Sequence, residues 1–67
     1  MRYYFHIIAN NERYDDEVGQ HCSGIEAATA RAAVVADELA QDTGWAGFSV
    51  MVIDEHGNEI VRRPIGK

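Results

Sequence analysis

The first residue that could do chemistry is His6, which lies in an apolar segment between Tyr4 and Ile8. Histidine is the side chain that most readily gains or loses a proton near neutral pH. His6 could therefore act as a general acid or base, or as a pH-sensitive group in an interface. The alternative is a structural role, in which a partly buried strand histidine has a hydrogen-bonded ring nitrogen. Both roles fit this position.

The adjacent imidazole and thiol of His21 and Cys22 suggest a metal site or a thiol–imidazole pair. Neighbouring residues of an extended strand point to opposite faces, so these two side chains cannot readily hold one ion. A structural zinc site takes four nitrogen or sulfur ligands, and the only such residues of this chain are three His and one Cys that are scattered across 67 residues. We therefore expect no metal and no cofactor, and we expect Cys22 to be a small buried apolar side chain.

Two acidic segments could attract a cation. Asp15-Asp16-Glu17 lacks the alternating oxygen ligands and the glycine of a calcium loop, so a solvated loop is expected. Residues 54–58 are of types that favour a tight turn, and this turn explains their presence without a ligand. No Ser, Cys or Asp has an evident base and orienting partner, and no glycine loop has phosphate-binding form. We therefore expect that the protein is not an enzyme.

Length and charge restrict the class of protein further. The 67 residues predict a single domain, 1–67, with one small core and marginal stability, which a partner subunit would increase. Six Lys and Arg against eleven Asp and Glu give a net charge of −5, which disfavours direct binding of nucleic acid. Arg62, Arg63 and Lys67 are interpreted as solubilising charge near a strand edge.

The apolar start of the chain, Tyr3 to Ala9, is too short for a membrane span and lacks the features of a secretory signal. A single free thiol fits a reducing compartment. We therefore expect a cytoplasmic protein that does not interact with membranes.

The segments that must position these residues show two kinds of sequence periodicity, that of β-strands and that of an α-helix. Segment 2–9 alternates as a strand, and Asn10-Asn11 is a plausible turn into a short return strand at 12–14. Asp15-Asp16-Glu17 interrupts that strand, and an extended course resumes at 18–22. Segment 48–63 is predicted to be a β-hairpin, with a type I turn at 54–57 and Gly57 at the φ > 0 position of a bulge.

Helical spacing occupies the middle of the chain, from Ile25 to Asp42. Ser23 lies three residues before Glu26, which is the spacing of a capping box, and Gly44 is expected to end the helix. The stripe expected to face the sheet is Ile25, Ala28, Ala32, Val35, Ala36 and Leu39. The fold class is therefore α+β, with an antiparallel sheet of three to four strands in ββαββ order and one helix packed on one face.

One helix cannot cover both faces of this sheet. If it packs on the face of Phe5, Val50 and Val52, the opposite face is still largely apolar, whereas a solvated face should be mostly polar. Exposed apolar surface of this kind tends to mark an interface. The candidate interface residues are Tyr4, His6, Ile8, Met51, Ile53 and Val61.

Four segments carry a resemblance to a known family, and together they cover nearly the whole chain. They are the opening Arg2-Tyr3-Tyr4-Phe5-His6-Ile7, the acidic Asp16-Glu17 followed by Gly19, the helix start Ile25-Glu26-Ala27-Ala28, and the closing segment 47–57. With these the chain resembles a family of short bacterial proteins that is known as a domain of unknown function. This resemblance implies no catalytic or cofactor residues.

The order of elements is also similar to that of HicB-type antitoxins, in which a strand pair leads through a glycine-containing segment, here 19–23, into an alanine-rich helix. Two functions follow as hypotheses. The first is a non-catalytic interaction module that forms a homo-oligomer or binds a protein partner. The alternative is a HicB-like antitoxin whose acidic surface binds a small basic toxin nuclease.

Overall fold

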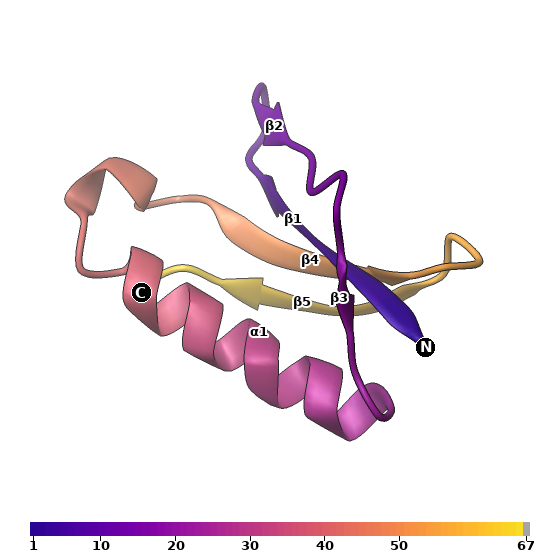
Figure 1. The fold of residues 1–67 in the computed structure, drawn as a ribbon. Helices are drawn as coiled ribbons and strands as arrows, with labels where there is room; N and C mark the ends of the chain where they lie inside the picture. Colours follow the sequence, from indigo (N-terminus) through magenta and orange to yellow (C-terminus); the bar gives the residue numbers. More distant parts are fainter. Residues whose placement is uncertain (67) are drawn as a thin grey trace.

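The computed structural model describes residues 1–66, in which three strands precede a helix, a short 3₁₀ helix and two further strands (Figure 1). The elements are β1 Arg2–Ile8, β2 Arg13–Tyr14, β3 Gln20–His21, α1 Ile25–Leu39, η1 Thr43–Trp45, β4 Ser49–Asp54 and β5 Glu59–Pro64.

All these strands join one antiparallel sheet, in which β4 lies between β1 and β5. The other edge of β1 pairs with β2 at its C-terminal end and with β3 at its N-terminal end. The predicted α+β class is confirmed. The predicted three to four strands in ββαββ order are wrong in detail, because the described chain has five strands in βββαββ order. Segment 15–19 leaves the sheet and divides the return strand into two short pieces.

The hairpin between β4 and β5 has the predicted turn. The backbone N–H of Gly57 donates to the carbonyl of Asp54 at 3.0 Å, and the N–H of Asp54 donates to the carbonyl of Asn58 at 3.0 Å. Gly57 has φ of 87°, in the left-handed region that favours glycine. This is a type I turn with a bulged glycine, and the prediction is confirmed.

A second irregularity lies inside the hairpin and changes one candidate residue. Val52 pairs with Val61, but the next residue, Ile53, pairs with Glu59, so Ile60 is an extra residue on β5. A β-bulge of this kind shifts the alternation of side chains by one position. Val61 therefore lies on the same face as Val52 and packs against the core. The prediction that Val61 belongs to the candidate interface on the opposite face was wrong.

The helix packs against β4 and β5 on one side of the sheet (Figure 1). Ala28, Ala32 and Ala36 are buried against the core, which also contains Val50 and Val52. Alanine has no side chain beyond Cβ, so the helix axis can approach the sheet closely.

Three expectations at the helix ends were wrong. Ile25 was expected to face the sheet, but it lies in the first turn of the helix, one turn before Ala28, and is 57% exposed. The N-cap is Gly24 and makes no side-chain cap hydrogen bond, so Glu26 is at the second helical position and the capping box with Ser23 does not form. The helix ends at Leu39, and Gly44 lies within η1 instead.

Among residues 1–66, no helix combines the length and apolar character that crossing a membrane requires.

Candidate functional site

The sheet face opposite α1, called here the far face, carries five of the six predicted interface residues. Strand pairing places Tyr4 beside Ile53 and His6 beside Met51, with Ile8 next to them on β1. Tyr4, Ile8 and Ile53 are half-buried, whereas His6 and Met51 are 9% and 6% exposed. The far face is therefore less open than the alternation of the strands predicted, because other side chains and a loop cover its centre.

His6 is covered by the loop between β2 and β3. The backbone N–H of Asp16 donates to Nδ1 of His6 at 2.9 Å, and the ring of His6 stacks beside that of Tyr4 with centroids 6.4 Å apart. A backbone N–H can only donate, so Nδ1 accepts and the proton of the neutral ring lies on Nε2. The carboxylate of Asp15 is 3.6 Å from the same nitrogen. The hydrogen-bonded, structural role of His6 is the one that this geometry supports.

The Asp16 carboxylate holds this loop against β1. Its Oδ2 accepts from the backbone N–H of Phe5 at 3.2 Å, and its Oδ1 accepts from Val18 and Gly19 at 3.1 and 3.0 Å. Phe5 lies on β1 between the short pairings with β2 and β3, so the side chain takes the place of the missing strand partner. Burial acts to raise the pKa of Asp16, but the three backbone donors Gly19, Phe5 and Val18 outweigh it and lower that pKa. The acidic run thus contains a structural residue and is more than the solvated loop that was expected.

Gly19 allows the loop to approach the far face closely. Its φ is 75°, and a Cβ at this position would lie 2.8 Å from Cε2 of Tyr4 and 2.9 Å from Cγ of Arg2. Both distances are shorter than a non-bonded carbon contact, so only glycine fits without displacement.

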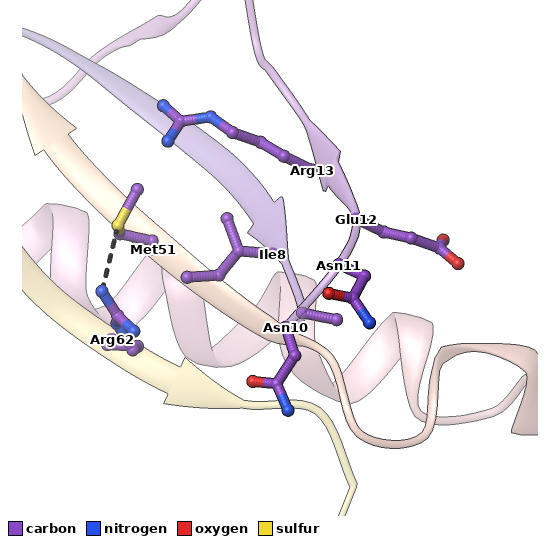
Figure 2. Close-up of a pocket in the computed structure, with 8 residues that line it drawn as sticks. Ile8, Asn10, Asn11, Glu12, Arg13, Met51 and Arg62 are labelled. Carbon is purple, nitrogen blue, oxygen red and sulfur yellow. Dashed lines mark hydrogen bonds between the residues drawn. The ribbon is translucent and has the colours of Figure 1, made fainter.

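An open hollow of about 420 Å³ lies at the other end of the far face (Figure 2). Ile8 and Met51 are its large apolar residues, and Arg62 covers Met51 by donating from Nη2 to Sδ at 3.5 Å. The same guanidinium pairs with Glu59 at 3.0 Å, and Arg13 on the opposite side pairs with Asp15. The remaining lining residues are Ala9, Asn10, Asn11 and Glu12. The hollow is thus lined by apolar side chains and by two arginines, each of which pairs with a carboxylate outside the lining.

His21 and Cys22 point away from one another, as expected for neighbours on an extended segment. His21 is exposed, with Nε2 at 3.1 Å from the N-terminal nitrogen of Met1, while Cys22 is buried in the core. In the part of the chain that the structure describes, no three His, Cys, Asp or Glu side chains come together as a metal site.

Asp54 serves the hairpin turn. Its Oδ1 accepts from the backbone N–H of His56 and of Asn58, both at 2.9 Å, and its Oδ2 accepts from the Asn58 amide at 3.2 Å. The backbone hydrogen bond from Asn58 contributes most to lowering the pKa of Asp54. These contacts are the turn chemistry that the residue types indicated.

One further cluster was not found by reasoning from the sequence. The rings of Tyr14, Trp45 and Phe48 lie within 5.2 to 6.1 Å of one another, centroid to centroid. Trp45 and Phe48 are close in sequence, which is a weak signal, but Tyr14 comes from β2 more than thirty residues earlier. Only the folding of β2 beside β1 brings it to the other two rings.

Comparison with known proteins gives one family. No curated protein and no solved structure matches the chain. The similarity to HicB-type antitoxins therefore rests on the order of elements alone. The model of one family matches residues 2–66, nearly the whole chain, in agreement with the resemblance noted from the four segments. The chain belongs to the family described as domain of unknown function DUF6894.

Proposed function

We propose that this domain is a small, non-catalytic interaction module that forms a homodimer through the far face. The observation that carries the proposal is the set of half-buried apolar side chains, Tyr4, Ile8 and Ile53, on a sheet face that α1 does not cover. A second copy of the chain, placed about a two-fold axis, would bury this set against itself.

The composition of the core supports a second copy as the occupant. The largest side chains that are fully buried are Val50 and Val52, and α1 contributes alanines to the core. A domain of 67 residues with so little buried volume gains stability when a partner subunit buries further apolar surface.

The charges of the far face also suit self-association. Arg62 is paired with Glu59 and Arg13 with Asp15, so both signs are present around the hollow and two copies can exchange these pairs. The net charge of −5 on each copy opposes association at low ionic strength. Salt near physiological concentration reduces the range of that repulsion to about 8 Å, so dimerisation should strengthen as salt is added.

Sedimentation equilibrium at micromolar to millimolar concentration tests the proposal. The wild type is expected to dimerise, and Ile53→Lys to be monomeric because it places a charge in the interface. Val34→Lys is the matched control, since Val34 is 44% exposed on the outer side of α1 and its substitution should leave the dimer intact. A wild type that stays monomeric throughout, or an Ile53→Lys protein that dimerises equally well, contradicts the proposal.

A second measurement covers the case in which Ile53→Lys does not fold. The melting temperature of a dimer that unfolds to monomers rises with protein concentration, whereas that of a monomer does not change. A melting temperature of the wild type that is constant over a hundredfold range of concentration also contradicts the proposal.

The acidic balance favours one other candidate, a HicB-like antitoxin that binds a small basic toxin nuclease. An adjacent gene for a short basic protein, whose toxicity is relieved by co-expression of this chain, would support it. Co-expression without relief would exclude that neighbour as the target.

A further inference from the structure

The aromatic cluster at the end of the sheet forms one wall of a hollow of about 330 Å³. Tyr14 lies on β2, Trp45 in η1 and Phe48 just before β4. The ring of Trp45 is nearly perpendicular to both others, at 80° to Tyr14 with centroids 5.5 Å apart and at 79° to Phe48 with centroids 5.2 Å apart. In such an edge-to-face pair the edge of one ring lies against one face of the other, and the opposite face of each ring does not contact its partner. A ring face of this kind attracts a positively charged group.

The remaining lining residues of this hollow are Glu12, Asp42 and Gly44. Of the six lining residues, two are acidic and none is basic. Both carboxylates are held in place: Oε2 of Glu12 accepts from the Tyr14 hydroxyl at 3.0 Å, and Oδ1 of Asp42 accepts from the backbone N–H of Gly44 at 2.8 Å. The hydrogen bond to Glu12, with its negative charge, raises the pKa of Tyr14, as expected where the local potential is negative.

Core packing explains only part of this arrangement. Trp45 and Phe48 pack against the core, but Tyr14 is 51% exposed and adds its ring on the outside of theirs. An anion would be repelled by the two carboxylates, and a neutral apolar ligand would gain nothing from them. A cation gains from both the ring faces and the carboxylates.

We propose that this hollow, lined by Tyr14, Trp45, Phe48, Glu12 and Asp42, binds an organic cation that carries a methylated ammonium group. The ring faces contact the methyl groups and the two carboxylates neutralise the charge. This is the combination by which aromatic sites recognise quaternary ammonium ligands.

The site shares Glu12 with the hollow of the far face, but its three rings lie on the other side of the sheet. Tyr14 pairs with Ile7, which packs against the core on the α1 side, whereas Arg13 pairs with Ile8 of the far face. The rings of the organic-cation site and the far face therefore lie on opposite sides of the sheet. A dimer without cation binding, or cation binding by a monomer, would separate the two proposals.

Fluorescence of Trp45 provides a direct measurement, because it is the only tryptophan of the chain and lies in the site. Choline is titrated into the full chain beside 3,3-dimethylbutan-1-ol, which has the same shape without the charge. We expect choline to bind at least about tenfold more tightly than the neutral alcohol. Equal binding of the two, or no response to choline at millimolar concentration, overturns the proposal.

Variants test the two kinds of contact separately. Tyr14→Leu keeps an apolar side chain but removes a ring face, and it should weaken choline binding about fivefold. Glu12→Gln removes one charge at nearly constant shape and should weaken it about threefold. Glu17→Gln removes an equivalent charge from an exposed residue outside the hollow and should leave binding unchanged. Glu12 and Glu17 variants with the same affinity would show that choline responds only to net charge, which contradicts the site.

The source of the cation is distinguished by a second pair of ligands. N-acetyl-trimethyllysine amide represents a modified lysine on a partner protein, and N-acetyl-lysine amide is its unmethylated control. Tighter binding of the trimethyllysine compound than of choline assigns the site to a protein side chain, and the reverse assigns it to a small molecule. Tighter binding of the unmethylated lysine compound than of both overturns the role of the methyl groups.

Discussion

The backbone N–H of Asp16 donates a hydrogen bond of 2.9 Å to Nδ1 of His6, across the edge of β1 that the divided return strand leaves unpaired. This contact fixes the tautomer of the imidazole and covers it. It also ties the central residue of the acidic run to the centre of the far face.

The first prediction concerns that tautomer. Because Nδ1 accepts from a backbone donor, the neutral ring of His6 should carry its proton on Nε2. Long-range ¹⁵N–¹H correlation spectra report the tautomer of each histidine. His56 is exposed in the hairpin turn and serves as the internal control, with a mixture of tautomers expected. A spectrum in which Nδ1 of His6 carries the proton would show that the loop does not sit on the ring as described.

The second prediction concerns stability in acid. The lowered pKa of Asp16 means that the unfolded chain takes up a proton there at a higher pH than the folded chain does. The stability that Asp16 contributes is therefore present above its ordinary pKa of 3.8 and is lost as the pH falls through the folded value. Urea unfolding from about pH 6 to about pH 2 should show a steeper loss of stability in the wild type than in Asp16→Asn.

Asp15 and Asp54 also have lowered pKa values and contribute to the acid dependence of both proteins, so the difference between the two curves isolates Asp16. Glu17→Gln changes the next residue of the same loop, which is exposed, and should follow the wild type. Parallel curves for the wild type and Asp16→Asn would be the contrary result.

The third prediction separates steric from conformational cost at two glycines. Gly19 and Gly57 both have positive φ, at 75° and 87°, but only a Cβ on Gly19 meets neighbouring atoms, the nearest being Cε2 of Tyr4. Gly57→Ala should lower the free energy of unfolding by about 1 kcal/mol from backbone strain alone. Gly19→Ala should cost about 2 to 3 kcal/mol, because Tyr4 or the loop must also move. Equal costs in chemical denaturation would mean that the close approach to Tyr4 is not maintained in solution.

The fourth prediction concerns the alanine contact between α1 and the sheet. Ala32 is fully buried, so Ala32→Leu inserts side-chain atoms where the helix lies on the sheet and should destabilise the fold by about 1 to 3 kcal/mol. Ala30→Leu makes the same change on the exposed side of α1 and should alter stability by less than about 0.5 kcal/mol. Thermal unfolding followed by circular dichroism measures both, and a destabilisation of the Ala30 variant as large as that of the Ala32 variant would place the contact face elsewhere.

Local patterns were sufficient for several features. The turn at Gly57 needs a residue that tolerates positive φ beside polar turn residues, and that information is contained within a few positions. The buried positions Ala28, Ala32 and Ala36 follow from helical spacing, because a helix presents each fourth residue to the same neighbour. The interruption of the return strand by the acidic run was likewise visible in the order of residues.

Other features depend on contacts between distant segments. The side of the sheet on which Val61 lies depends on the extra residue Ile60, and strict alternation gives the wrong side once a bulge is present. The role of Asp16 depends on an unpaired N–H of Phe5, which exists only because β2 and β3 are both short. A carboxylate in a polar run offers no local sign of such a partner.

The sequence by itself determined the α+β class, the hairpin turn and the helical stripe, because periodicity and turn chemistry are short-range properties of the chain. Only the tertiary structure decided which apolar residues of the far face stay open, how His6 is covered, and that Tyr14 meets Trp45 and Phe48. These outcomes depend on the register of strands and the path of a loop, which bring together residues that are far apart in sequence.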